Sequence, residues 1–169
     1  MIIRQETVGD HDAVYELVKE AFASAERSDG NEQDLVSALR ESPAFIPQLS
    51  LVAVADGRIV GHILFTKITI GGTTAVALAP LAVRPSHQRM GVGSALIREG
   101  HRIAADLGYD YSVVLGHPDY YPRFGYVPAR TLSITGPFDV PDEVYMAVRL
   151  REDAEAIHGR VQYDPAFGI

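Results

Sequence analysis

The spacing of apolar residues predicts three amphipathic helices. Apolar positions recur at intervals of three and four in two segments near the N-terminus and in one central segment, a spacing that buries one face of a helix. The first helix is expected to begin at Asp10, which can cap it, and the second near Asn31. The central helix is expected to begin at Gly91 and Gly93 and to stop at Gly108. The three apolar stripes are Val14, Leu17, Val18, Ala21 and Phe22; Leu35, Val36 and Leu39; and Val92, Leu96, Ile97, Gly100, Ile103, Ala104 and Leu107.

Segments of strand type lie between and after these helices. Two short turns, Asp56-Gly57 and Gly71-Gly72, join three consecutive strands into an antiparallel meander. A strand that follows the central helix is expected to run parallel to the strand before that helix, because a helix crosses between them. The expected strands are Ile2 to Glu6, Leu49 to Ala55, Arg58 to Ile70, Thr73 to Val83, Tyr111 to Leu115, Thr131 to Thr135 and Glu143 to Arg149, and the tail from Gly159 to Ile169 is expected to pack back on the domain.

Pro80 lies inside the third strand of the meander, where it cannot donate a hydrogen bond to a neighbouring strand. We therefore expect a bulge or an unpaired segment at this residue. Beyond it, the free N–H and C=O groups of the strand could pair with an amide-rich ligand as another strand would. The strand from Tyr111 to Leu115 is expected to diverge at this point and to leave a wedge.

Composition narrows the possible functions. The 169 residues, 47% hydrophobic and 22% charged, are those of an ordinary globular protein, which we expect to form a single domain over residues 1–169. The chain contains no cysteine, which excludes disulfides and thiolate chemistry, and its six histidines show no metal-binding spacing.

The net charge of −7 argues against general nucleic-acid binding, which requires an excess of Lys and Arg. The N-terminus does not resemble a signal peptide, and the apolar runs are too short to cross a bilayer. We therefore expect a cytoplasmic protein with neither nucleic-acid nor membrane partners. A homodimer remains open.

The segment Gln88-Arg89-Met90-Gly91-Val92-Gly93-Ser94 joins a strand to the central helix. Two glycines at a helix N-terminus leave backbone N–H groups uncovered by Cβ atoms. These groups lack intrahelical partners and lie at the positive end of the helix dipole, so they can bind a phosphate group. The surrounding charge agrees, because the chain from Arg84 to Arg102 carries four arginines, namely Arg84, Arg89, Arg98 and Arg102, and a single acid, Glu99.

Other uses of a glycine pair fit this segment less well. The Rossmann fingerprint needs a third glycine where this chain has Leu96, and the P-loop needs a lysine that is absent nearby. The glycines could also serve only to let the helix pack closely on the sheet, and a nucleotide such as ATP or NAD is a further possible ligand.

The pattern Gln-x-x-Gly-x-Gly after a strand ending Leu81-Ala82-Val83-Arg84-Pro85 resembles the acetyl-CoA-binding motif of the GNAT N-acetyltransferase superfamily. Most of the chain is similar to one branch, the YhbS-like N-acetyltransferases. This resemblance implies an α+β fold with a mostly antiparallel mixed sheet, a splayed parallel strand pair and about four helices. The similar segments are Leu35 to Arg40, Leu49 to Ala53, Ile59 to Ile63, Leu78 to Val83, Gln88 to Ile97 and Leu115 to Tyr126.

The resemblance also implies acetyl-CoA as the donor, an amine of a small molecule or a protein as the acceptor, and no metal. The backbone of Leu81 and Val83 is expected to pair with the pantetheine arm. The implied cofactor-binding residues are Leu81, Ala82, Val83, Gln88, Arg89, Met90, Gly91, Val92, Gly93 and Ser94.

Tyr121 is the candidate general acid, because it stands four residues before Gly125 as in the Tyr-x-x-x-Gly-Phe/Tyr segment of the superfamily. A phenol with a pKa of about 10 can protonate a thiolate whose thiol has a pKa of about 8.5. Glu32 is the candidate base. His62, His117 and a relay of water remain alternatives. The branch usually has Gly-Asp-Pro where this chain has a histidine at position 117.

The acceptor pocket is expected to involve the first two helices, the loop from Ser24 to Gly30 and the tail from Tyr163 to Phe167. The acids Glu26, Asp29, Glu32 and Asp34 favour a cationic amine, or they form a solvated face. A non-catalytic acyl-CoA-binding sensor would need the same glycine loop. The sequence therefore leaves enzyme and sensor open as alternatives.

Overall fold

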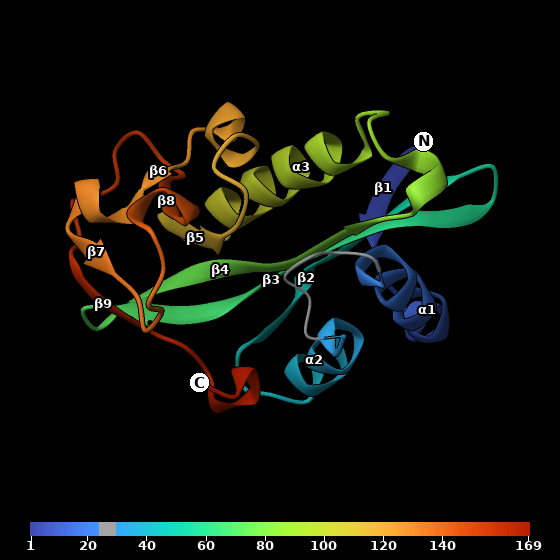
Figure 1. Cartoon of the computed structure of the whole chain (residues 1–169), viewed down its shortest axis with the longest axis horizontal. Coiled ribbons are helices and arrows are strands. Elements are labelled where there is room, and N and C mark those ends of the chain that lie inside the picture. The colour runs from blue at the N-terminus through green and yellow to red at the C-terminus, as the bar shows by residue number, and fades with distance from the viewer. Residues whose placement is uncertain (24–29) are drawn as a thin grey trace.

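The computed structural model describes residues 1–23 and 30–169, which contain three α-helices and nine strands (Figure 1). The helices are α1 (His11–Phe22), α2 (Glu32–Arg40) and α3 (Val92–Asp106). The strands are β1 (Ile2–Gln5), β2 (Phe45–Ala55), β3 (Arg58–Ile70), β4 (Thr73–Val83), β5 (Tyr111–Leu115), β6 (Val127–Pro128), β7 (Ile134–Thr135), β8 (Tyr145–Arg149) and β9 (Gly159–Gln162). None of the helices in these residues is long and apolar enough to span a bilayer.

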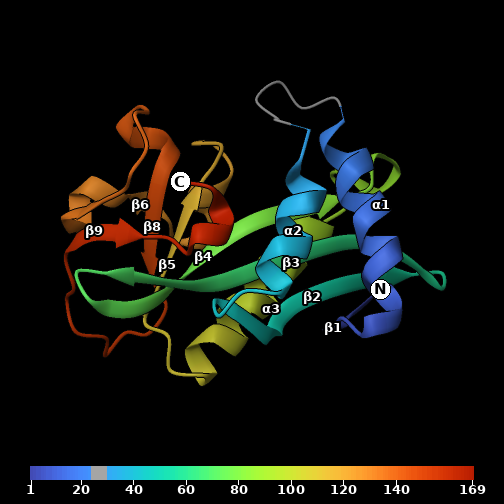
Figure 2. The same cartoon turned by 90° about the horizontal axis from the view of Figure 1, so that it is seen from below.

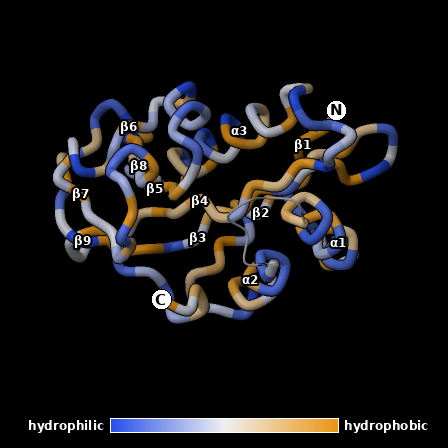
Figure 3. The backbone as a smooth tube through the Cα atoms, viewed as in Figure 1, coloured by the Kyte–Doolittle hydropathy of each residue, from blue (hydrophilic) through white to orange (hydrophobic). Residues whose placement is uncertain are grey.

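The strands form one mixed sheet with helices on both faces. Its main order is β1-β2-β3-β4-β5-β8-β6, and β9 pairs with β3 and β7. Helix α3 covers one face, and α1 and α2 lie side by side on the other (Figures 1 and 2). Hydrophobic stretches follow the strands, whereas polar residues occupy turns such as the one between β2 and β3 (Figure 3). This is the α+β fold with a mostly antiparallel sheet that the sequence predicts.

The predicted meander of β2, β3 and β4 is present. Asp56 and Gly57 have φ values of 52° and 75°, and Gly71 and Gly72 have φ values of 55° and 88°. Positive φ at both central residues is what a type I′ hairpin turn requires, and glycine adopts it without steric cost. The turns therefore set the antiparallel pairing of all three strands.

The bulge predicted at Pro80 is also present. Leu81 pairs with Ile63 and Leu78 pairs with Phe65, so two residues of β4 lie opposite one residue of β3. Beyond this bulge β4 has left β5, because the only paired positions of these two strands in the described structure are Val76 with Ser112 and Ala77 with Val113. The parallel pair is thus short and splayed, as expected.

Helix α3 packs tightly on the sheet through its apolar stripe, in which Leu96 and Ile97 are fully buried. A Cβ atom at Gly100 would lie 2.3 Å from Cε2 of Phe65, so a side chain there would push the helix off β3. On β3, a Cβ atom at Gly61 would lie 2.7 Å from Cγ1 of Val92. Some glycines near α3 therefore do serve close packing.

Two sequence expectations near the C-terminus need correction. The strand expected over Thr131–Thr135 is a 3-10 turn at Ala129–Leu132 followed by the short β7, because Ser133 has a left-handed φ of 60°. Strand β8 starts later than the expected Glu143, since Asp142–Val144 forms another 3-10 turn. The tail packs back on the domain as expected, through β9 and a 3-10 turn that lies beside α2. Three α-helices plus such turns replace the expected four.

Two expectations near the N-terminus also need correction. Asp10 precedes α1, but its carboxylate does not cap that helix and instead accepts hydrogen bonds from the backbone N–H of Thr7 and from Arg4, both at 2.7 Å. Strand β2 begins earlier than the expected Leu49. It includes Pro47, which lies where pairing with β3 is irregular and where a missing N–H donor is tolerated.

Candidate active site

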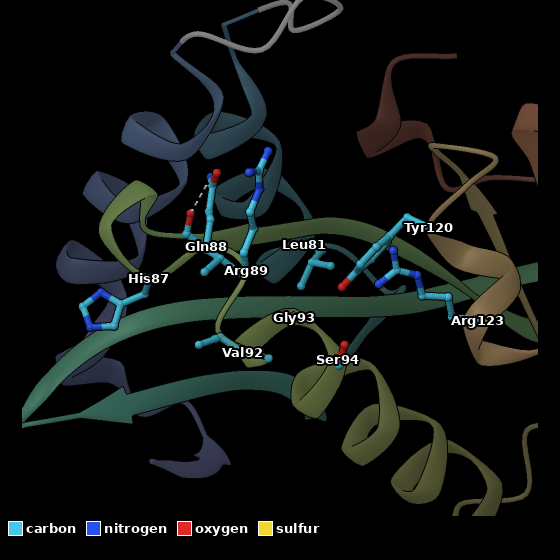
Figure 4. Close-up of a pocket in the computed structure, with 11 residues that line it drawn as sticks. Leu81, His87, Gln88, Arg89, Val92, Gly93, Ser94, Tyr120 and Arg123 are labelled. Carbon is cyan, nitrogen blue, oxygen red and sulfur yellow. Dashed lines mark hydrogen bonds between the residues drawn. The ribbon is translucent and has the colours of Figure 1, made fainter.

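A pocket of about 620 Å³ opens at the N-terminus of α3 (Figure 4). Strand β4, the loop that follows it, the first turn of α3 and the segment after β5 all contribute to its wall. The lining residues are Leu81, Val83, His87, Gln88, Arg89, Gly91, Val92, Gly93, Ser94, Tyr120 and Arg123. All but two of the cofactor-binding residues expected from sequence lie here. The two exceptions are Ala82, which is buried toward α1, and Met90, which is 67% exposed.

Backbone N–H groups of the first turn of α3 face this pocket. The first hydrogen bond of the helix runs from the N–H of Ala95 to the carbonyl of Gly91, so the preceding amides have no acceptor within the helix. Gly91 has a φ of 84° and Arg89 a φ of 65°. Left-handed residues in a turn point successive N–H groups to one side and form an anion-binding concavity. Arg89 holds this conformation at a steric cost, a feature that gathers at functional sites.

The edge of β4 supplies further backbone groups. The N–H of Arg84 donates to the carbonyl of Val60 on β3 at 2.8 Å. Because backbone groups alternate between the two edges of a strand, the N–H groups of Leu81 and Val83 point away from β3 and toward the gap beside β5. Gln88 donates from Nε2 to the carbonyl of Val83 at 3.3 Å, which ties the loop to the strand (Figure 4).

The charge of the pocket is positive and uncompensated. Among the described residues, its lining contains no aspartate or glutamate, whereas Arg89 and Arg123 both face it. The sequence pointed instead to four arginines around the glycines, and three of these act elsewhere. Arg84 pairs with Glu20, Arg98 lies over the ring of Phe124, and Arg102 pairs with Glu99 and Asp106. Helix periodicity turns Arg98 and Arg102 away from the pocket.

Sequence reasoning missed Tyr120 and Arg123, which reach the pocket from beyond β5. The segment that contains them was identified by resemblance, but only Tyr121 was singled out within it. The hydroxyl of Tyr120 points toward Gly93, where a Cβ atom would lie 2.6 Å from it (Figure 4). The adjacent tyrosines 120 and 121 could have indicated this position. Adjacent residues in a turn point in different directions, so if one tyrosine is buried the other can face the pocket.

Tyr121 lies deeper than its neighbour and does not line the pocket. Its ring packs on Gly116, where a Cβ atom would lie 2.3 Å from Cε2, and it makes edge-to-face contacts with Tyr120 and Tyr126. Burial, with a smaller effect from Tyr120, raises the pKa of the Tyr121 phenol above its usual value of about 10, so the phenol keeps its proton at neutral pH. Gly116 directly follows β5, which places Tyr121 beside the point where β4 and β5 have separated.

The candidate bases are spread over both faces of the sheet. Glu32 is the first residue of α2, half-buried, on the face opposite α3. Asp34 accepts a hydrogen bond from Tyr15 at 2.9 Å. Residues 24–29, which include the proposed acceptor-side acids Glu26 and Asp29, lie outside the described residues.

The two candidate histidines differ sharply. His62 is fully buried on β3, with Nε2 3.1 Å from Oγ of Ser50 and 3.5 Å from Oε1 of Glu6. Burial lowers the pKa of His62 despite Glu6, so we take its imidazole to be neutral and structural. His117 is exposed and accepts a hydrogen bond at Nδ1 from the N–H of Asp119. Over the described ranges, no cluster of three or more His, Asp or Glu residues could hold a metal ion.

Comparison with known proteins identifies the family. Residues 11–126 match the Acetyltransferase (GNAT) family. The uncharacterized N-acetyltransferase YhbS of Escherichia coli is 31% identical over 99% of this chain and 98% of its own length. The uncharacterized N-acetyltransferase YjhQ of the same species is 44% identical, over 66% of this chain and 65% of its own length.

Solved structures agree with the sequence match. A crystal structure of Escherichia coli YhbS in complex with CoA has a TM-score of 0.89 and 30% identity, and the match covers 99% of this chain and 92% of that one. A GNAT family acetyltransferase from Brucella melitensis in complex with acetyl-CoA has a TM-score of 0.81 and 32% identity, with 98% and 97% covered. The chain therefore belongs to the GNAT family of acetyltransferases.

Proposed function

We propose that this protein is an acetyl-CoA-dependent N-acetyltransferase that moves an acetyl group directly to an amine of a small molecule or a protein. The observation that carries the proposal is the pocket at α3, which combines exposed helix amides, two arginines without a carboxylate and an open strand edge. These three features suit a ligand that carries a diphosphate joined to an amide-containing arm. Relatives that share the fold were crystallised with CoA and acetyl-CoA.

Each part of the pocket has a proposed role. The amides of Gly91 to Ser94, with Arg89 beside them, hold the diphosphate. The N–H groups of Leu81 and Val83 pair with the pantetheine arm, and Gln88 fixes the loop against β4. The N–H of Val83 is also the proposed donor toward the carbonyl oxygen on which negative charge develops.

Acetyl-CoA supplies an acetyl thioester, whose C–S bond breaks as the C–N bond to the amine forms. Tyr121 is the proposed general acid that protonates the departing sulfur, and its raised pKa keeps this proton available at neutral pH. The amine must lose a proton, since only about one part in two thousand of a lysine-type amine is neutral at pH 7. Glu32 is the proposed base for this step.

The test is release of free thiol from acetyl-CoA across a panel of amines, amino acids and peptides. Replacing Tyr121 by Phe should lower kcat by about 100-fold or more, because general acid catalysis contributes roughly that much, while the Kd for acetyl-CoA changes little. Tyr109→Phe is the matched control, because Tyr109 lies beyond the other end of α3 and its variant should keep normal turnover.

The alternative of a non-catalytic acyl-CoA sensor makes the opposite prediction for the same assay. A sensor would bind CoA and transfer no acetyl group to any amine offered. If calorimetry detects no CoA binding at all, both the enzyme and the sensor are wrong.

A further inference from the structure

Arg123 presents an unneutralised cation to the pocket. It belongs to the 3-10 turn Tyr121–Phe124, and its Cζ lies 5.6 Å from the centroid of the Tyr120 ring (Figure 4). Within the described residues no carboxylate or carbonyl group bonds its guanidinium. A cation–π contact holds a guanidinium in place while leaving its N–H donors free for a ligand. Arg123 is therefore positioned and still able to bind an anion.

Some exposed arginines of the described residues have carboxylate partners, whereas others, such as Arg58 and Arg160, have none. Arg130 pairs with Asp142, and Arg151 lies beside Asp110 and Asp153. The lack of a carboxylate partner is therefore not what distinguishes Arg123. What distinguishes it is its fixed place in the pocket wall, against the ring of Tyr120.

The Tyr120 side chain separates Arg123 from the helix amides. Its hydroxyl points toward Gly93 in the first turn of α3, while the guanidinium of Arg123 stacks on its ring (Figure 4). The pocket therefore has two anion positions. One is formed by the amides near Gly91 with Arg89, and the second is the guanidinium of Arg123. A ligand that fills both carries two separated anionic groups, and a diphosphate with a separate phosphate is such a pair.

We propose that Arg123, stacked on Tyr120, binds the ribose 3′-phosphate of the donor and makes the protein prefer CoA to the same molecule without that phosphate. This inference rests on the proposed function, because it requires that the pocket binds CoA. The guanidinium suits the role, since its N–H donors match phosphate oxygens in bidentate geometry. Tyr120 acts as a positioning residue.

Calorimetric titration with CoA and with 3′-dephospho-CoA tests the proposal on the full chain. The unchanged protein should bind CoA about tenfold more tightly than 3′-dephospho-CoA, the size expected for one charge-assisted contact. Arg123→Gln should weaken CoA binding about tenfold and leave 3′-dephospho-CoA binding within about twofold, which removes the preference. Arg98→Gln is the matched control, because Arg98 lies over Phe124 of the same turn but outside the pocket, and this variant should keep the preference.

Several outcomes would overturn the proposal. Equal binding of the two ligands by the unchanged protein, or an equal loss for both ligands in Arg123→Gln, would show that Arg123 does not read the 3′-phosphate. Either result leaves the proposed function standing. Binding of neither ligand by the unchanged protein would instead remove the proposed function, and this inference would fall with it.

The stacked geometry has its own test. Tyr120→Phe keeps the aromatic face and should keep the preference for CoA. Tyr120→Leu removes that face, so Arg123 loses its fixed position and the preference should shrink by about threefold or more. A full preference in Tyr120→Leu would contradict the positioning role of the ring.

Discussion

Two regions on opposite faces of the sheet contain charged side chains. In one the charges have no carboxylate partner among the described residues, and in the other they are paired. The pocket at α3 exposes Arg89 and Arg123 to an open volume without a carboxylate. On the opposite face, a buried polar cluster consists of Glu6, Arg40, Ser50 and His62. There Arg40 donates to both carboxylate oxygens of Glu6 at 2.8 and 2.9 Å, and His62 bonds Ser50.

The difference shows that the pocket is suited to bind a ligand, whereas the buried polar cluster stabilises the fold. In the buried polar cluster each charge meets its partner, because an unpaired charge under α1 and α2 would cost several kcal/mol. In the pocket solvent stabilises the arginines until a ligand arrives, so they need no partner from the protein. His62 resembles a catalytic residue by type, yet it belongs to the buried polar cluster, since it is 0% exposed. Tests of this contrast should move stability in one region and ligand affinity in the other.

The largest expected effect comes from breaking the buried ion pair. Arg40→Met should lower the free energy of unfolding by about 3 to 5 kcal/mol, because it leaves the Glu6 carboxylate buried without its main partner. Urea denaturation measures this change. Arg102→Met is the control, because Arg102 is an exposed partner of Glu99 and Asp106 on α3 and its loss should cost less than about 1 kcal/mol. If both variants lose less than about 1 kcal/mol of unfolding free energy, the buried ion pair stabilises the fold no more than an exposed one.

The second effect is a dependence of stability on pH. Burial raises the pKa of the Glu6 carboxyl, but hydrogen bonds from His62 and Arg40 outweigh burial and lower this pKa from 4.5 to about 2. A carboxyl whose pKa is lower in the folded state stabilises the protein above pH 4.5, and this contribution is lost as the pH falls toward 2. Between pH 6 and pH 3 the loss attributable to Glu6 should be about 2 kcal/mol.

The measurement compares urea denaturation of the unchanged protein and of Glu6→Gln at pH 6 and pH 3. The variant is less stable at pH 6, and its stability should fall by about 2 kcal/mol less on acidification, because the titrating group is gone. Equal falls in both proteins would assign the acid sensitivity to other carboxyls.

The fold could be read from the sequence where local chemistry decides it. The two glycine turns, the stripe of α3 and the bulge at Pro80 are all set by neighbouring residues and appear as predicted. The exception is Leu107, the last residue of the predicted stripe, which follows the helix and is 43% exposed. The glycine loop was predictable for the same reason. Short 3-10 turns were not, because a single left-handed residue such as Ser133 ends a strand without a clear signal in the surrounding pattern.

The charges of the two regions could not be assigned from the sequence, because their partners come from distant segments. Arg84 looks like a phosphate ligand beside the glycines, but α1 brings Glu20 to it. Arg123 reaches the pocket only through β5 and the turn behind it. Nearness along the chain therefore identified the backbone part of the pocket and misassigned most of its arginines.

The smallest expected effect distinguishes the contribution of the Arg89 cation to ligand binding from that of its left-handed backbone conformation. Arg89→Gly keeps the left-handed conformation at φ 65°, which glycine adopts freely, and removes the cation. It should weaken CoA binding about tenfold in calorimetry, the loss of one hydrogen-bonded charge, with a free energy of unfolding changed by less than about 0.5 kcal/mol. Asp56→Gly makes the same replacement at φ 52° in the turn between β2 and β3 and should leave CoA binding unchanged. Unchanged CoA binding in Arg89→Gly would show that the amides alone hold the ligand and that the free charge of this loop is incidental.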